Sequence, residues 1–355
     1  MVIPIRRKIS SQRFSDIYNV DFMAGLFRRR AFKYFGQPSL SFKLSRLEIV
    51  RNFLNKFTNL ALKYTLLVNG KKIIIRGRAD ATNDAPQRCF RVLQLLKKSG
   101  FAHAPVPLDY LPQFNLLLYK DIPGVPLSEM LNSQEGALIV FALIPSLAKL
   151  LKEFHAIPPD KLSYDIFQKS KDILQKETKH WLSLVKKGPQ GVQKEYQTRI
   201  SKMLIFLPYL KPLAQGSLVH GDFHLGNIIA YRHRLYFFDF GDSCRSDPFE
   251  DIGRFLAQTR LMTWHRFPHE FLPRYDKILS FFLGSYFGRD LTASERFRLA
   301  FWELFSLFQM SAIFIGFRQK WAKDEKDLRL YFSWMDEYLA LLKNLISPAQ
   351  TSSAE

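Results

Sequence analysis

Cysteine is scarce in this chain of 355 residues, which contains two, Cys89 and Cys244. The two cysteines form no C-x-x-C pair and no zinc-ligand spacing, so the sequence supports neither a disulfide framework nor a zinc site. Sparse cysteine without a disulfide framework is typical of reducing compartments. We therefore expect a cytoplasmic protein.

Long uncharged apolar segments are also lacking. The longest apolar run, residues 300–317, contains Glu303 and Gln309. A membrane span needs about 20 apolar residues, and a charge inside it is costly. We expect a buried core helix at this run. The first five residues are followed at once by Arg6-Arg7-Lys8, which leaves no apolar stretch of the length that a secretory signal needs.

Acidic residues are outnumbered, with 32 Asp and Glu against 52 Lys and Arg, and the formal net charge is +20. This excess favours anionic partners and argues against a polycationic aminoglycoside as substrate. Residues 1–56 are especially basic and interleave phenylalanines with Arg28-Arg29-Arg30. Either these aromatic side chains pack on the first lobe with the charges in water, or the basic face binds an anionic membrane or RNA. Nucleic acid is not expected as a partner.

The residue types that carry chemistry concentrate between His220 and Gly241. Asp222 follows His220-Gly221, Asn227 comes five positions later, and Asp239 follows a β-type run. Phosphoryl transfer requires a carboxylate near the acceptor hydroxyl and hard oxygen ligands that hold Mg²⁺ against nucleotide phosphates. Asp222 suits the first role, and Asn227 and Asp239 suit the second.

This segment resembles the aminoglycoside phosphotransferase and choline kinase family, whose pattern is H-G-D-x-x-x-x-N followed by a strand and D-F. Gly221 stands where protein kinases have Arg, which favours a small-molecule kinase. The resemblance implies ATP and Mg²⁺ as cofactors, with Asp222 as the catalytic residue and with Asn227 and Asp239 as metal ligands. The partners would be a nucleotide and a small-molecule acceptor.

The same resemblance extends past this motif. Asp251 stands at the place where the family has a residue that begins a helix and braces the catalytic loop. His220 is expected to be a structural support rather than an acid or base.

The fold that the resemblance implies is α+β, a two-lobed protein kinase-like fold with a small β-rich N-lobe and a larger, mostly helical C-lobe. The Asn69-Gly70 pair between two β-rich runs predicts a hairpin in the N-lobe. Helical periodicity follows over residues 88–98. The expected boundaries are 1–56 for a basic N-terminal extension, 57–122 for the N-lobe, 123–346 for the C-lobe and 347–355 for a disordered tail.

The nucleotide site would lie on the strand that follows the hairpin. Arg76 ends the run Ile73-Ile74-Ile75-Arg76, where the family has Val-Ala-Ile-Lys, so Arg76 is the expected phosphate-binding cation. Lys72 shares its strand face because side chains alternate along a strand. By resemblance, Tyr119 and Asp121 belong to the segment that links the lobes and lines the adenine slot.

Two expected parts of the nucleotide site are absent from the sequence. No Glu occurs between Glu48 and Glu129, so the usual Lys–Glu ion pair cannot form, and Asp80 and Asp84 are the candidate substitutes. A glycine-rich phosphate loop is also missing. The chain is therefore expected to be an ATP-dependent kinase that phosphorylates a hydroxyl of a neutral or anionic small molecule. The alternatives are a pseudokinase that acts as a nucleotide-binding or scaffolding module, and a nucleic-acid or membrane adaptor, which only the net charge of the chain suggests.

Overall fold

The computed structural model describes residues 14–36, 41–52, 59–158, 169–210, 216–316 and 325–351. The chain divides into two compact units. The N-terminal unit comprises Val2–Pro126 and Asn227–Ser243, and the C-terminal unit comprises Leu127–Gly226 and Cys244–Glu355. Residues 227–243, which include two of the predicted metal ligands, therefore belong to the N-terminal unit.

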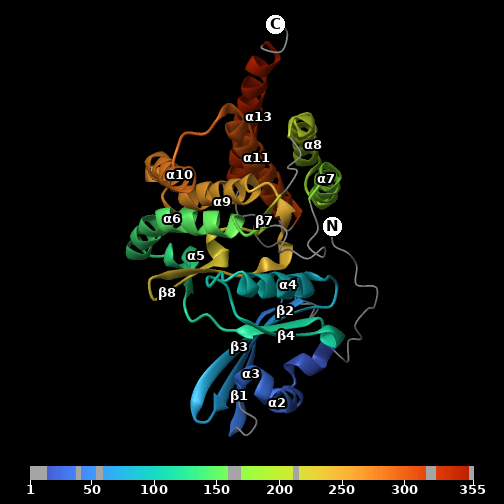
Figure 1. The fold of residues 1–355 in the computed structure, drawn as a ribbon. Coiled ribbons are helices and arrows are strands. Elements are labelled where there is room, and N and C mark those ends of the chain that lie inside the picture. The colour runs from blue at the N-terminus through green and yellow to red at the C-terminus, as the bar shows by residue number, and fades with distance from the viewer. Residues whose placement is uncertain are drawn as a thin grey trace. The chain divides into compact units, whose positions relative to one another are not determined.

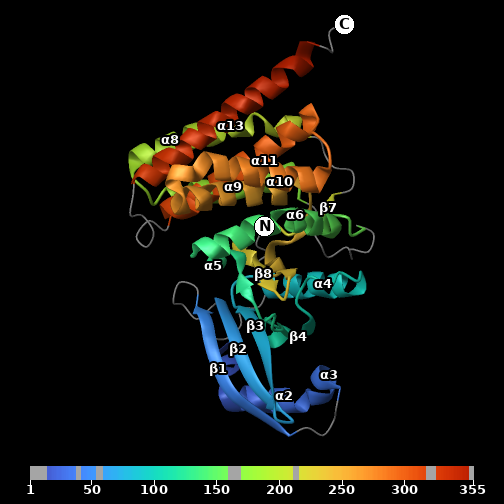
Figure 2. The same cartoon turned by 90° about the vertical axis from the view of Figure 1, so that its left-hand side faces the viewer.

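The N-terminal unit is built around a five-stranded antiparallel sheet in the order β1-β2-β3-β5-β4. Its strands are β1 (Phe42–Asn52), β2 (Asn59–Val68), β3 (Lys71–Asp80), β4 (Pro107–Leu111) and β5 (Leu116–Lys120). Figure 1 and Figure 2 show β1, β2 and β3 side by side from two directions. The predicted β-rich N-lobe is thus present.

The turn between β2 and β3 is the predicted Asn69-Gly70 hairpin. Asn69 has φ 49° and Gly70 has φ 75°. Positive φ at both central positions is the requirement of a type I′ turn, and Asn and Gly are the residues that tolerate it best. The turn fixes the register in which Tyr64 lies opposite Ile75. The hairpin prediction is confirmed.

This register divides β3 into an apolar face and a basic face. Ile75 and Ala79 are buried in the core of the unit. Because side chains alternate, Lys72, Arg76 and Arg78 lie on the other face of the strand. The strand therefore presents its cations on the face opposite the hydrophobic core.

Two helices near the N-terminus cover the apolar face of the sheet. They are α2 (Val20–Arg29) and α3 (Ala31–Phe35), preceded by the short 3₁₀ helix η1 (Asp16–Tyr18). The ring of Phe27 lies 5.2 Å from the ring of Tyr64 between centroids, and the Tyr64 hydroxyl donates to the carbonyl of Ile17 at 2.8 Å. Burying a phenylalanine side chain contributes about 1.5–3 kcal/mol. The described aromatic residues of this segment therefore belong largely to the core.

Charged contacts also hold these helices. Asp109 of β4 accepts hydrogen bonds from Lys33 and Tyr34, each at 2.7 Å, and pairs with Arg30. Since β1 is part of the sheet, the sheet begins on the N-terminal side of the boundary expected at residue 57. Phe32 remains 66% exposed beside these cations, and a membrane role for this surface stays a prediction.

The rest of the N-terminal unit consists mainly of one further helix and a small sheet. They are α4 (Ala85–Lys98), β6 (Val125–Pro126), β8 (Ile228–Tyr231) and β9 (Arg234–Phe237), with the 3₁₀ helices η3 (Pro112–Phe114) and η7 (Phe240–Asp242). The small sheet has the order β6-β8-β9.

The C-terminal unit is mostly helical, as expected. Its helices are α5 (Leu127–Met130), α6 (Gln134–His155), α7 (Lys171–Val185), α8 (Gln190–Leu204), α9 (Phe249–Arg266), α10 (Phe271–Phe287), α11 (Ala293–Gly316) and α13 (Glu325–Thr351). The short elements are β7 (Ser217–Val219), paired with β10 (Cys244–Ser246), and the 3₁₀ helices η5 (Leu207–Tyr209), η6 (Leu225–Asn227) and η8 (Pro268–Glu270). α13 continues to Thr351, so the helix includes the first residues of the tail that we expected to be disordered. Residues 352–355 lie outside the described residues.

Helix α11 carries the longest apolar run of the sequence. Among the described residues it is the one helix long and apolar enough to cross a membrane, and 72% of its most apolar window is buried inside the structure. Glu303 is buried within it and accepts hydrogen bonds from the hydroxyls of Tyr338 and Tyr275. These contacts are those of a core helix, as the charged Glu303 led us to expect.

Candidate active site

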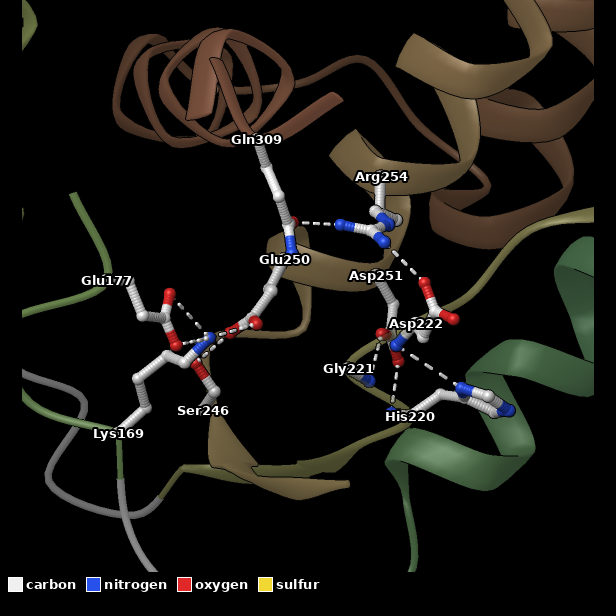
Figure 3. Close-up of polar contacts among 10 residues, drawn as sticks. All are labelled: Lys169, Glu177, His220, Gly221, Asp222, Ser246, Glu250, Asp251, Arg254 and Gln309. Atoms are coloured by element: carbon white, nitrogen blue, oxygen red, sulfur yellow. Dashed lines mark hydrogen bonds and ion pairs between the residues drawn. The ribbon is translucent and has the colours of Figure 1, made fainter. Parts of the chain in front are cut away.

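The predicted catalytic loop follows β7 in the C-terminal unit. Gly221 has φ 78°, a left-handed conformation that glycine adopts without strain. The turn directs two successive backbone N–H groups at one carboxylate: His220 donates to Oδ2 of Asp251 at 2.6 Å, and Gly221 donates to Oδ1 at 2.9 Å (Figure 3). Asp251 lies in the first turn of α9 and has no exposed surface.

A third group completes the surroundings of Asp251. Nε2 of His155, at the end of α6, lies 2.9 Å from Oδ2 of Asp251, and Nδ1 of His155 lies 2.7 Å from the hydroxyl of Tyr286. Because an ionised carboxylate only accepts hydrogen bonds, Nε2 of His155 is the donor in this contact. The buried carboxylate thus accepts from two backbone groups and one side chain, which fixes the loop against α6 and α9.

Asp222 has different neighbours. Nη2 of Arg254, on α9, pairs with Oδ1 of Asp222, and Nε2 of His224 lies 3.5 Å from Oδ2. Arg254 also donates through Nη1 to Gln309 of α11 (Figure 3). Burial would raise the pKa of Asp222, but the positive charge of Arg254 and the hydrogen bond from His224 together hold that pKa well below its usual value. The Asp222 carboxylate is therefore ionised.

His220 lies inside the same loop and is completely buried. Its Nδ1 accepts a hydrogen bond from the backbone N–H of Asp222 at 3.3 Å, and its ring lies 6.0 Å from the ring of Phe223. These contacts orient the backbone at Asp222. They are compatible with the supporting role expected for His220, which stays a prediction.

A buried ion-pair cluster supports the start of α9. Nζ of Lys169 lies 2.6 Å from Glu250 and 3.2 Å from Glu177, and Ser246 donates to Glu250 at 2.6 Å (Figure 3). Burial alone would lower the pKa of Lys169, but the two carboxylates raise it, so the ammonium group stays charged. Because Glu250 precedes Asp251, the cluster fixes the helix turn from which Asp251 reaches the loop.

The predicted metal ligands Asn227 and Asp239 lie in the N-terminal unit. The backbone N–H of Phe238 donates to the carbonyl of Asn227 at 3.1 Å, which joins the two stretches of chain. Asp239 follows β9 with φ 65°, a conformation uncommon for residues other than glycine and frequent at functional sites. Its carboxylate pairs with Arg78 of β3, a residue to which the sequence gave no role.

Asn227 and Asp239 offer an amide oxygen and a carboxylate oxygen. These are hard ligands that suit Mg²⁺, which usually takes one or two protein carboxylates and completes its shell with water and substrate phosphates. Among the described residues, no group of three or more His, Cys, Asp or Glu side chains is arranged to hold a metal ion. The donor set therefore fits a magnesium ion shared with a nucleotide and does not fit an all-protein site.

Three of the four predicted nucleotide-binding residues lie together. Nε of Arg76 donates to Oδ1 of Asp121 at 2.6 Å, and Arg76 lies opposite Tyr119 in the β3–β5 pair. Burial raises the pKa of Tyr119 to about 12, so its hydroxyl stays protonated. Lys72 lies nearer the beginning of β3 and is exposed. Lys72 and Asp121 both line a cavity of about 870 Å³ that also includes Tyr34.

The two candidate substitutes for the missing Glu have other partners. Asp80 is buried and accepts from the backbone N–H groups of Thr82 and Asn83 at 2.7 and 3.1 Å, so it caps a turn. Asp84 lies 3.6 Å from Arg88, which in turn lies 3.8 Å from Asp242.

Sequence reasoning gave no role to Arg78, Arg254 or His224. Arg78 could have been found by alternation, because it lies two residues beyond Arg76 on the same face of β3. Arg254 could have been considered because it lies three residues after Asp251 on a helix, where side chains share a face. His224 has no local signal of this kind.

Comparisons with known proteins agree with this geometry. A family model described as "Phosphotransferase enzyme family" matches residues 61–295, more than half of the chain. A search of curated proteins finds no match.

Solved structures resemble the chain over most of its length. A Ralstonia eutropha protein assigned as an aminoglycoside phosphotransferase is 16% identical, with a TM-score of 0.64 over 91% of this chain and 98% of its own. A choline kinase from Cryptosporidium parvum is 14% identical, with a TM-score of 0.60 over 93% and 97%. A spectinomycin phosphotransferase in complex with ADP and spectinomycin is 11% identical, with a TM-score of 0.58 over 92% and 98%. Together with the family match, they show that this chain has the protein kinase-like fold and belongs to the phosphotransferase enzyme family.

Proposed function

We propose that this protein transfers the γ-phosphoryl group of ATP to a hydroxyl group of a small molecule, with Mg²⁺ as the metal. The observation that carries the proposal is the catalytic loop. An ionised Asp222 lies on a backbone turn that is held by the buried carboxylate of Asp251. In chain order this loop is followed by Asn227 and Asp239, the residue types that hold a magnesium ion.

In the proposed reaction Asp222 accepts the proton of the acceptor hydroxyl as that oxygen bonds to the γ-phosphorus. An ionised carboxylate can take this role, and its main contribution is to position the hydroxyl. Asp251 and His220 keep the backbone of Asp222 in place. Because their hydrogen bonds hold this backbone, the Asp222 carboxylate is already in position when the substrate binds, as catalysis by positioning requires.

In the N-terminal unit, Asn227 and Asp239 would hold Mg²⁺, which neutralises charge on the nucleotide phosphates when it is bound. Arg78 lies against Asp239, so its guanidinium is within reach of phosphate oxygens that share the ion. Arg76 and Lys72 are further candidates for phosphate contacts, and Tyr119 and Asp121 for the adenine side. Similar solved structures contain ADP in one case and AMP-PNP with Ca²⁺ in another, which supports nucleotide and divalent-metal use here.

A pseudokinase is the rival proposal, and two observations favour it. The described part of helix α4 offers no Glu, and Arg78 is engaged by Asp239 itself. If that ion pair persisted with nucleotide bound, Arg78 would compete with the metal for the Asp239 carboxylate. Such a protein would bind nucleotide without turning it over.

The test is ADP release from ATP and Mg²⁺ with a panel of sugars, polyols, amino alcohols and lipid head groups. We expect Asp222→Asn to lower turnover on the order of 100-fold, the size of general-base assistance, while nucleotide affinity stays within a few-fold. Asp172→Asn is the matched control, because Asp172 is an exposed carboxylate at the start of α7. ADP release that Asp222→Asn leaves unchanged, in a protein that binds ATP, would favour the pseudokinase.

A further inference from the structure

Arg254 lies beside Asp222 and has more hydrogen-bond donors than its neighbours use. Its Nη2 pairs with Asp222 and its Nη1 donates to Gln309. A guanidinium group has five N–H donors. Among the described residues, the buried Nε of Arg254 has no hydrogen-bond partner. The Arg254 side chain is 11% exposed and that of Asp222 is 26% exposed, so a molecule that reaches Asp222 meets Arg254 as well.

The charge of Arg254 has one compensating partner in the part of the chain that the structure describes, and that partner is Asp222. Gln309 is neutral and fixes the guanidinium without offsetting its charge. In the proposed transfer, the acceptor oxygen bonds to the γ-phosphorus, the bond from that phosphorus to ADP breaks, and the hydroxyl proton moves to Asp222. Protonation removes the negative charge that faces Arg254 at this step.

We infer that Arg254 binds an anionic group of the acceptor, a phosphate or a carboxylate, so that the substrates are small hydroxyl compounds carrying an acidic group near the reacting hydroxyl. The inference rests on the proposed function. Guanidinium groups bind such anions through parallel hydrogen bonds. The anion offsets the charge of Arg254 when Asp222 takes the proton, whereas an ammonium group at this place is repelled. The net charge of +20 draws anionic molecules to the protein in general.

Two other roles for Arg254 make a different prediction. A side chain that only orients Asp222, or that only stabilises the transferred phosphoryl group, affects neutral and anionic acceptors equally. A side chain that binds the acceptor's anionic group affects the anionic acceptor more. Matched pairs of acceptors therefore separate these roles.

The experiment compares glycerol with glycerol 3-phosphate, glucose with glucose 6-phosphate, and galactose with galacturonate. For each compound kcat/KM is measured by ADP release, and binding without nucleotide is measured by calorimetry. We expect the unmodified protein to prefer the anionic member of at least one pair by about tenfold or more, the size of one charge-assisted hydrogen bond. Arg254→Gln should reduce that preference to within about threefold, and Arg254→Lys should retain part of it.

Arg199→Gln is the matched control, because Arg199 forms an ion pair with Asp336 in the same unit. It removes the same charge and should keep the preference. The inference is overturned if the unmodified protein shows no preference for any anionic member, or if Arg254→Gln keeps the preference. The binding measurements decide this even if no acceptor yields ADP, an outcome that would count against the proposed function alone.

Discussion

Asp251→Asn should uncouple the catalytic loop from α9 while keeping the shape of the side chain. In the unmodified protein Oδ2 accepts from His220 and His155, and Oδ1 accepts from Gly221. The amide nitrogen of an asparagine must replace one of these oxygens. Replacing Oδ1 is less costly because it removes one hydrogen bond, whereas replacing Oδ2 removes two.

The expected loss can be worked from these contacts. A hydrogen bond to a charged group contributes about 1.5–3 kcal/mol, and a buried donor left without an acceptor adds a penalty of similar size. In the variant the N–H of Gly221 faces an amide N–H₂ group. We therefore expect the free energy of unfolding to fall by about 2–4 kcal/mol, and turnover to fall on the order of 100-fold because a displacement of about 1 Å has that effect.

Urea unfolding and ADP release measure the two effects. Tyr286→Phe is the control, because it removes a hydroxyl from Nδ1 of His155 and leaves all the contacts of Asp251 in place. It should lower the free energy of unfolding by about 0.5–1.5 kcal/mol and change turnover by no more than a few-fold. An Asp251→Asn protein as stable and as active as the unmodified one would refute the bracing role of Asp251.

Three further predictions concern other carboxylates and cations. Asp239→Ala should remove the Mg²⁺-dependent part of nucleotide binding in calorimetry; unchanged Mg²⁺ dependence in a folded variant would exclude Asp239 as a ligand. Arg78→Ala should weaken ATP binding by about 1.5–3 kcal/mol and leave adenosine unaffected, because Asp239, its partner, would bind Mg²⁺ and leave Arg78 for the phosphates. Arg76→Ala should have a smaller effect, because Asp121 continues to offset the charge of Arg76. Burial raises the pKa of Glu303 to about 7, although its hydrogen bonds and the nearby Arg260 act to lower it. The folded state therefore holds a proton that the unfolded chain loses near pH 4.5. Stability should therefore fall by about 3 kcal/mol as the pH rises from 4.5 to 7; urea unfolding at pH 5 and pH 8 should show this dependence in the unmodified protein and not in Glu303→Gln.

The features that the sequence predicted correctly have local causes. The Asn69-Gly70 turn requires two residues that tolerate positive φ, and that requirement is visible in the two residues themselves. The core helix expected at residues 300–317 is likewise visible as an apolar run with a Glu in it, and the structure describes it as part of α11 up to Gly316. The segment 1–56 was harder, because whether β1 extends the sheet depends on its pairing with β2, which no pattern inside β1 determines.

The contacts of the catalytic loop were only partly predictable for the same reason. The loop residues stand in a recognisable order, so Asp222 and Asp251 could be named from the sequence. Other contacts could not be named, because His155, which contacts Asp251, and Gln309, which contacts Arg254 beside Asp222, come from helices far away in the chain. Tertiary packing chooses such partners, and a spacing rule applies only within one element.

The two carboxylates of this region show why environment, and not residue type, determines what each one does. Asp251 has no exposed surface and gives its oxygens to three N–H groups, so its charge is used to hold the backbone. Asp222 is 26% exposed and faces Arg254 and His224, so its charge remains accessible to an incoming hydroxyl. Asp222 on the loop and Asp251 on α9 can therefore serve separate roles because their surroundings differ. Removing Arg254 changes the surroundings of Asp222 and leaves the contacts of Asp251 in place. It should therefore change the chemistry of Asp222 without changing the support that Asp251 gives.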